Sequence, residues 1–311
     1  MGDFRTLSDN EVPSVHLDGA WQTPASVYNE TWGYRAWQVR ENLDEKVKEL
    51  LKGFVGGGNY LLNIGPRGDG SIVEFEAKAL REIGAWIKRH PSAAKAASTY
   101  LDSYSWGEIK YLDGALYLMI EDIPENGEIQ LNGLLSDVSQ IVEDGTTKDL
   151  EWQQAEDKLS MKIGAFEEQM LPVIKVILND ALQVMPQKTV HLENKQQMTA
   201  DDFYYGYGYH EQGNYNSMKQ VVVRYTTYLL KADGGEVSLN IQGTPASDKK
   251  YRVNVGDDVY IVAGDDLVTS KIGPFQVEAN QVTPFSITLA DPVHGGEPLD
   301  LTLESVEVSI D

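Results

Sequence analysis

The stretch that decides the fold of this chain is Asn59-Tyr60-Leu61-Leu62-Asn63-Ile64-Gly65-Pro66. It is a short, nearly continuous apolar run, typical of a strand that is buried on both faces of a parallel sheet. Ahead of it, the segment from Glu41 to Phe54 places apolar residues on one face of a helix, at Leu43, Val47, Leu50, Leu51 and Phe54. Three glycines, Gly56 to Gly58, end that helix.

A second helix is predicted after the strand. Ser71-Ile72-Val73-Glu74 matches the capping box, in which a serine side chain caps the first turn of a helix. The residues that follow share one apolar face, at Phe75, Ala79, Leu80, Ile83 and Ile87. The order helix, strand, helix indicates an α/β fold. Because a complete eightfold barrel takes about 250 residues, we expect residues 1–90 to be the terminal part of a (β/α) TIM-like barrel whose remainder precedes Met1.

From about residue 105 the apolar period changes to two, which is typical of strands. Ile109 and Tyr111 alternate before Asp113-Gly114, and Leu116, Leu118 and Ile120 follow, so a hairpin with an Asp-Gly turn is predicted. Further strands are predicted at Glu128–Leu131, Leu150–Trp152 and Val173–Leu178. Short strands separated by turn residues favour a β-sandwich.

The last third of the chain is also predicted to be all β. Alternation runs through Val221, Val223, Tyr225, Thr227 and Leu229, and again through Val237, Leu239 and Ile241. Leu299, Leu301 and Leu303 share one parity, whereas Val306, Val308 and Ile310 share the other, so a β-bulge is expected at Glu304-Ser305. A polar stretch, Met185 to Gln197, is interpreted as a link between two jelly-roll-like sandwiches.

These patterns predict three domains in a multidomain α/β plus all-β chain. Residues 1–95 would be the C-terminal part of a barrel, residues 100–188 a β-sandwich, and residues 195–311 a second β-sandwich. Hydrophobic residues make up 41% of the chain, which is enough to build cores.

Composition excludes several classes of function. Acidic residues outnumber basic ones 48 to 26, a formal net charge of -22, and such a field repels nucleic acids and anionic membranes. No cysteine is present, so disulfides and thiolate chemistry are excluded. No apolar run reaches about 18 residues, the length that spans a membrane. The five histidines are far apart, and the pairs Asp257-Asp258 and Asp265-Asp266 are typical of ordinary turns, so we expect no metal and no cofactor.

Residues 1–90 resemble the α-L-fucosidases of glycoside hydrolase family 29. Three blocks carry the resemblance: Gly2-Asp3-Phe4-Arg5-Thr6; Trp21-Gln22 through Thr31-Trp32-Gly33-Tyr34; and Gly57 through Pro66 with Asp69-Gly70. The segment from Trp106 to Leu178 is similar to the small sandwich that follows the barrel in this family. Beyond about residue 190 the resemblance is architectural only, to jelly-roll carbohydrate-binding modules.

The resemblance implies retaining hydrolysis of terminal α-L-fucose from glycans, with an aspartate nucleophile and a second carboxylate as acid/base, in a pocket at the C-terminal ends of the barrel strands. It also implies an extracellular or periplasmic location, although Met1 to Ser14 is too polar for a signal peptide. No residue of this chain matches the nucleophile, so the isolated chain is expected to be inactive. The alternative is a non-catalytic carbohydrate-binding fragment or a pseudo-enzyme.

The candidate site residues follow from the same resemblance. Glu11 is the candidate acid/base, although direct counting puts Ser8 at that position, and Asp9 is a weaker alternative. Trp32, and with it Trp21, would line the apolar face of fucose, unless either ring serves only packing. Gln22 stands where the family often has Glu. Asn59, Asn63 and Gly65 are expected to shape the last strand and its turn.

A Tyr-rich run, Asp201 to His210, is the densest aromatic cluster of the chain. A twisted strand at a sheet edge is the favoured interpretation, because exposed aromatic side chains are common. A sugar platform with Asp201, Asp202 and Asn214 as polar partners is the alternative.

Overall fold

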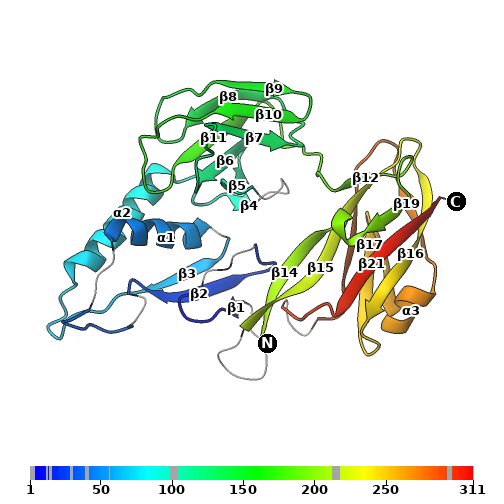
Figure 1. Cartoon of the computed structure of the whole chain (residues 1–311), viewed down its shortest axis with the longest axis horizontal. Helices are drawn as coiled ribbons and strands as arrows, with labels where there is room; N and C mark the ends of the chain where they lie inside the picture. Colours follow the sequence, from blue (N-terminus) through cyan, green and yellow to red (C-terminus); the bar gives the residue numbers. More distant parts are fainter. Residues whose placement is uncertain are drawn as a thin grey trace. The chain divides into compact units, whose positions relative to one another are not determined.

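The computed structural model describes residues 4–11, 13, 16–28, 31–38, 42–55, 57–98, 104–211, 218–292 and 296–310. The described chain consists mostly of β-sheets with few helices (Figure 1). It divides into two compact units. The first unit comprises Phe4–Ser14 and Ala20–Gln187, and the second comprises Met1–Asp3, Val15–Gly19 and Lys188–Asp311.

The first unit begins with a parallel three-stranded sheet in the order β1-β2-β3. Its strands are β1 (Arg5–Thr6), β2 (Trp21–Ser26) and β3 (Asn59–Asn63). The predicted strand is therefore confirmed as β3, which pairs in parallel with β2 from Gln22–Asn59 to Ser26–Asn63. The prediction that both its faces are buried is wrong, because Leu61 is 59% exposed. Its neighbour Leu62 packs against the core on the opposite face.

Two helices lie on one side of this sheet (Figure 1). They are α1 (Leu43–Val55) and α2 (Glu74–Arg89). Val47 and Leu51 of α1 are fully buried, as the apolar periodicity predicts, whereas Glu41 and Gly56 lie outside the described residues. Burial of β3 against α1, together with the negative charge of Glu49, raises the pKa of Tyr60 to about 12.

The predicted start of α2 is wrong. The helix begins at Glu74, after the N-cap residue Val73, which makes no side-chain cap. The backbone N–H and the hydroxyl of Ser71 instead both donate to Asp69 Oδ1, at 2.9 and 2.7 Å, so the serine completes an Asx-type turn rather than a helix cap. These bonds hold the pKa of Asp69 below its ordinary value. Leu80, placed by the sequence on the apolar face, is 38% exposed, and Trp86 is buried instead.

The rest of the first unit is two antiparallel sheets. One has the order β4-β5-β6-β11-β8 and the other β7-β10-β9. Their bounds are β4 (Ala97–Ser98), β5 (Gly107–Leu112), β6 (Ala115–Ile120), β7 (Glu128–Asn132), β8 (Val138–Glu143), β9 (Trp152–Ala155), β10 (Lys158–Lys162) and β11 (Val173–Leu178). The predicted hairpin is confirmed as β5–β6, with Asp113 and Gly114 both at positive φ, as its two-residue turn requires. The strand predicted at Leu150–Trp152 begins only at Trp152.

Two hydrophobic clusters hold this unit together. The first lies between the two antiparallel sheets and draws residues from both, including Leu118, Ile129 and Leu159. The second joins α1 and α2 to the outer face of β6 and β11, through residues such as Leu51, Trp86 and Tyr117. The helices are therefore packed between the parallel sheet and the five-stranded sheet.

The second unit also has two sheets around one core. One sheet has the order β12-β15-β20-β17-β18, with β14 on β15, and the other has the order β13-β21-β16-β19. The bounds are β12 (Thr189–His191), β13 (Gln197–Thr199), β14 (Tyr204–Glu211), β15 (Met218–Leu230), β16 (Gly235–Pro245), β17 (Lys250–Val255), β18 (Asp258–Ala263), β19 (Ile272–Val277), β20 (Thr283–Leu289) and β21 (Leu301–Ile310), with the short helices η1 (Ala200–Asp202) and α3 (Gly264–Thr269).

The β-bulge expected near Glu304 is confirmed. In the pairing of β16 with β21, Gln242 faces Ser305 while Gly243 faces Leu303, so Glu304 is the extra residue. The bulge lets Leu301 and Leu303 share the core with Val306 and Val308. The interpretation of Met185–Gln197 as a plain link is wrong, because Thr189–His191 forms β12, parallel to β15. The Tyr-rich run forms η1 and most of β14, and Asn214 lies outside the described residues.

Candidate functional site

The candidate site lies at the C-terminal edge of the three parallel strands. Strands that run in parallel end at the same edge, so the segments that follow β1, β2 and β3 meet there. The segment after β1 continues alongside β2, because the Asn10 N–H donates to the carbonyl of Pro24 at 2.9 Å. The side-chain oxygen of Asn10 in turn accepts the N–H of Ser26 at 2.8 Å. Asn10 adopts a φ of 58°, the left-handed conformation that asparagine tolerates.

Glu11 is fixed through its backbone. Its N–H donates to the carbonyl of Ser8 at 3.2 Å, and its own carbonyl accepts the hydroxyl of Thr23 at 2.6 Å. Thr23 is fully buried in β2, so the turn from Ser8 to Glu11 is attached to the sheet rather than extended into solvent. The half-buried Glu11 is thus held beside the middle of β2, and its neighbour Asn10 is held at Ser26, where β2 ends.

Trp32 belongs to the segment after β2, and its indole is 41% exposed. Two strand ends hold its backbone. The side-chain amide of Asn63, the last residue of β3, donates to the Trp32 carbonyl at 2.6 Å, and the Ser26 hydroxyl donates to the carbonyl of Thr31 at 2.8 Å. An exposed ring on an anchored backbone is suited to stacking on a ligand.

Trp21 is not brought together with Trp32. It is the first residue of β2, so it lies at the opposite end of the strand, and it is only 2% exposed. Its ring packs flat against Gly58, where an added Cβ would collide with the indole. This geometry agrees with the packing alternative for Trp21. Gln22, next to it, donates to the hydroxyl of Thr6 on β1 at 3.2 Å.

Sequence reasoning missed the support beneath this edge. Glu76, in the first turn of α2, is fully buried, and its Oε1 accepts the N–H of Gly65 at 2.8 Å. Among the described residues its Oε2 is buried without a partner. Gly65 packs closely on the backbone of Gly33 and Tyr34, just after Trp32. The feature of the sequence that could have revealed Glu76 is its place on the apolar face of the predicted helix, three residues before Ala79, where a carboxylate is unusual.

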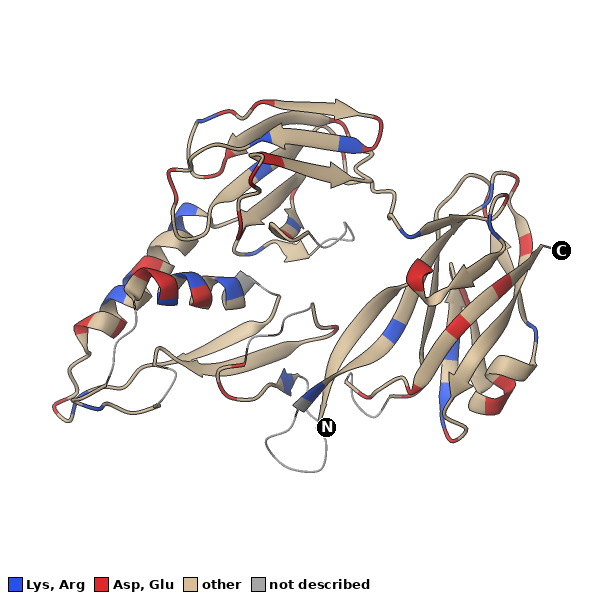
Figure 2. Ribbon diagram, in the orientation of Figure 1, with Lys and Arg blue, Asp and Glu red and all other residues tan. Residues whose placement is uncertain are grey.

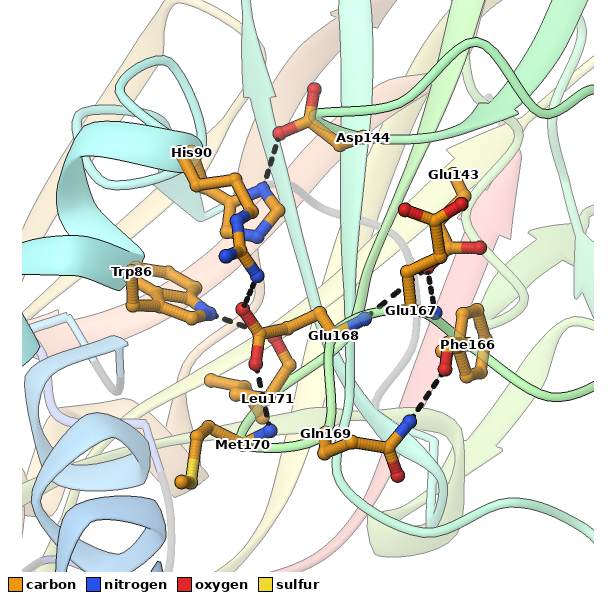
Figure 3. Close-up of polar contacts among 11 residues, drawn as sticks. Trp86, His90, Glu143, Asp144, Phe166, Glu167, Glu168, Gln169, Met170 and Leu171 are labelled. Atoms are coloured by element: carbon orange, nitrogen blue, oxygen red, sulfur yellow. Dashed lines mark hydrogen bonds and ion pairs between the residues drawn. The ribbon is translucent and has the colours of Figure 1, made fainter. Parts of the chain in front are cut away.

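A second polar network joins the end of α2 to the antiparallel sheets (Figure 3). The Trp86 Nε1–H donates to the carbonyl of Leu171 at 2.7 Å, and the buried His90 lies 2.7 Å from Asp144 through Nδ1 and Oδ2. Arg89 pairs with Glu168, and Glu143 accepts the N–H groups of Glu167 and Glu168. Each of these side chains bonds to another of them or to the backbone, so the network attaches the helix to the sheets, although His90 Nε2 is buried without a partner among the described residues.

Within the described ranges, no group of three or more histidine and carboxylate side chains is placed to hold a metal ion, and His294 lies outside these ranges. None of the helices in the described segments is long and apolar enough to cross a membrane.

Comparison with known proteins finds relatives for part of the chain. The family model for Alpha-L-fucosidase matches residues 1–92. Human tissue alpha-L-fucosidase is 29% identical over 167 residues, which cover 50% of this chain and 35% of the human protein. The chain spans about a third of the length of the curated relatives it matches.

Solved structures show the same fold. The crystal structure of alpha-L-fucosidase from Vibrio sp. strain EJY3 aligns with a TM-score of 0.51 at 17% identity, over 98% of this chain and 57% of that chain. Alpha-L-fucosidase isoenzyme 1 from Paenibacillus thiaminolyticus aligns with a TM-score of 0.50 at 24% identity, over 58% of this chain and 46% of that chain. The resemblance of this chain to the α-L-fucosidases of glycoside hydrolase family 29 is confirmed.

Proposed function

We propose that this chain contributes to retaining hydrolysis of terminal α-L-fucose from glycans. In this proposal residues 1–95 are the C-terminal part of a (β/α) TIM-like catalytic barrel, residues 100–188 a β-sandwich, and residues 195–311 a second, carbohydrate-binding-module-like sandwich. The parallel order β1-β2-β3 with helices on one side supports the barrel assignment. Two sheets around one core in each later segment support the sandwiches.

The observation that carries the proposal is that the residues just before Glu11 and Trp32 both bond to Ser26, the last residue of β2. Asn63, the last residue of β3, bonds to Trp32 itself. Active sites of such barrels lie at the C-terminal ends of the strands. Here Thr23 fixes the backbone of Glu11, while Asn63 fixes that of Trp32. The arrangement supplies a carboxylate and an exposed aromatic face from neighbouring strand ends.

In the proposed mechanism the Trp32 ring stacks on the apolar face of fucose, including its methyl group. The Glu11 carboxyl group donates a proton to the leaving oxygen and later accepts one from water, so it acts as acid and then as base. Trp21, proposed from the resemblance as a second sugar contact, instead supports the sheet from within, because it is only 2% exposed and packs on Gly58. The reaction needs two carboxyl groups and no cofactor. Fucosylated glycans outside the cell or in the periplasm are the proposed substrates.

A non-catalytic glycan-binding protein or pseudo-enzyme is the second candidate. Retaining hydrolysis needs two carboxyl groups about 5 Å apart, and within the described residues only Glu11, or Asp9 in its place, is assigned. Ser8 occupies the position that direct counting gives the acid/base, and Gln22 replaces a second carboxylate option. These substitutions favour binding without turnover.

An azide experiment separates the two candidates. We expect the chain alone to hydrolyse a fucosyl disaccharide very slowly, because no nucleophile is assigned. Azide ion, acting as an external nucleophile, should yield β-L-fucosyl azide, with the disaccharide's leaving oxygen protonated by Glu11. Glu11→Gln should abolish this product.

The readout is nuclear magnetic resonance of the products, with Asp9→Asn as the matched control. Loss of the azide product in Asp9→Asn and not in Glu11→Gln would assign the acid to Asp9. Rapid hydrolysis without azide would show that a nucleophile is present after all. Absence of product in every reaction, while fucose still binds, would favour the non-catalytic candidate.

A further inference from the structure

The outer face of the larger sheet of the second unit carries an ordered set of polar side chains. Its inward residues, such as Tyr225, Ile287 and Val253, form the core. The register places two rows across the opposite face. One row is Tyr204, Thr226, Ser286, Asn254 and Val259, and the next is Gly206, Arg224, Thr288, Arg252 and Ile261. We call these two rows the polar face.

Three polar atoms of this face are left without partners. Arg224 Nε, Thr226 Oγ1 and Asn254 Oδ1 are buried and form no hydrogen bond to any described residue. Thr226 and Asn254 lie in the same row, two strand spacings apart, and Arg224 lies in the adjacent row. Polar groups that lack partners are rare in folded proteins, and three on one face of one sheet indicate a common cause.

The donor and acceptor capacities of these three atoms indicate which kind of ligand could bind them. An arginine N–H only donates, an amide oxygen only accepts, and a threonine hydroxyl does both. A ligand that satisfies all three must therefore carry groups that both donate and accept, as sugar hydroxyls do. All three residues are only half-buried, so each has surface that a ligand on this face can contact.

The margins of the face are apolar. At one edge the rings of Tyr204 and Tyr228 meet edge to face at 6.3 Å. At the other, Val259 and Ile261 of β18 are 48% and 54% exposed. A polar centre between apolar margins fits the hydroxyls and C–H faces of a sugar chain more than one ring long.

Charge argues for a neutral ligand. The cations of this face are already engaged, since Arg224 pairs with Asp18 at 3.0 Å and Arg252 donates to the carbonyl of Ala290 at 3.3 Å. The other sheet of this unit carries acidic side chains on β16 and β21, such as Glu236 and Glu307 (Figure 2). An anionic polymer would find both arginines already engaged, and the net charge of -22 would repel it.

We propose that the polar face binds a neutral oligosaccharide through Thr226, Asn254 and Arg224. This binding surface belongs to the second unit alone and does not depend on Glu11 or Trp32. It would hold a glycan chain in addition to the fucose site proposed on the first unit.

The test uses the full chain and a panel of immobilised neutral glycans (fucosyllactose, mannan, xyloglucan and galactan), with dextran sulfate as the anionic comparison. Thr226→Val combined with Asn254→Leu should weaken binding of the retained neutral glycan about tenfold, since two hydrogen bonds are lost. The same double variant should melt no lower than the wild type, because it removes buried polar atoms that have no partner. A merely structural role for these residues predicts no loss of binding.

Two matched controls locate the surface. Thr302→Val with Asn240→Leu makes the same chemical changes on the outward side of the other sheet. Trp32→Ala removes the aromatic ring of the fucose site proposed on the first unit. Neither variant should change the binding of the neutral glycan. The proposal is overturned if no neutral glycan binds, if only dextran sulfate binds, or if the double variant binds as well as the wild type. Loss in Trp32→Ala alone would assign the binding to the first unit. The two single variants replace the double variant if it fails to fold.

Discussion

Replacing Trp86 with alanine is expected to lower the free energy of unfolding of the first unit by about 3–5 kcal/mol. The indole is 2% exposed and lies in the cluster that joins α1 and α2 to β6 and β11. Its removal leaves a cavity there, and the carbonyl of Leu171 loses the N–H that it accepts at 2.7 Å. Urea unfolding followed by tryptophan fluorescence measures the change. All six tryptophans lie at or before residue 152, so this signal reports the first unit.

Leu80→Ala is the matched control on the same helix. Leu80 is 38% exposed, so its truncation should change the free energy of unfolding by no more than about 0.5 kcal/mol. Equal losses in the two variants would show that α2 is not attached through Trp86.

Gly65→Ala is expected to destabilise the first unit by about 1–3 kcal/mol and to abolish sugar binding at the strand edge. An added Cβ would lie 2.7 Å from the backbone nitrogen of Tyr34 and 2.9 Å from the carbonyl carbon of Gly33. Neither backbone atom can rotate away, so the segment that carries Trp32 must shift. The same shift would weaken the hydrogen bond that the Gly65 N–H donates to the buried Glu76.

Gly68→Ala, in the same loop, is the control, because nothing lies within 4 Å of its added Cβ. Calorimetric titration with L-fucose and urea unfolding should show near wild-type behaviour for Gly68→Ala and loss of both properties for Gly65→Ala. Intact fucose binding in Gly65→Ala would mean that Gly65 does not position Trp32.

Local patterns predicted much of the fold. The β5–β6 hairpin followed from Asp113-Gly114, since both residues adopt the positive φ that the turn needs. The bulge at Glu304 followed from the change of parity between Leu303 and Val306. In each case the signal lies within a few residues, and the core confirms it because one face of the strand is buried.

Features that depend on contacts between distant parts of the chain were harder to predict from the sequence. The sequence did not reveal β1 or β2 as strands, because β1 has two residues and β2 contains Pro24, which is unusual inside a sheet. The exposure of Leu61 depends on what covers each face of β3, which no local pattern records. Ser71 fits a helix cap locally, yet Asp69 competes for the same hydroxyl and N–H.

In the candidate site, too, some residues could be predicted from the sequence, whereas those that depend on long-range contacts could not. Glu11 and Trp32 were singled out through family resemblance; Glu11 follows β1 and is bonded at Thr23 of β2, whereas Trp32 follows β2 and is bonded at the end of β3. Trp21 shared the resemblance but lies at the start of its strand. Glu76 was missed because its role depends on Gly65, eleven residues earlier, and on the backbone of Gly33 and Tyr34 beyond it.

The most direct test of the proposed sugar site is calorimetric titration of the whole chain with L-fucose and L-galactose. These sugars differ only in that the methyl group of fucose carries a hydroxyl in galactose. We predict that L-fucose binds more tightly, and that Trp32→Ala removes this binding while Trp37→Ala, at a 79% exposed position in the same segment, leaves it unchanged. Equal affinity for the two sugars, or undiminished fucose binding in Trp32→Ala, would contradict the account.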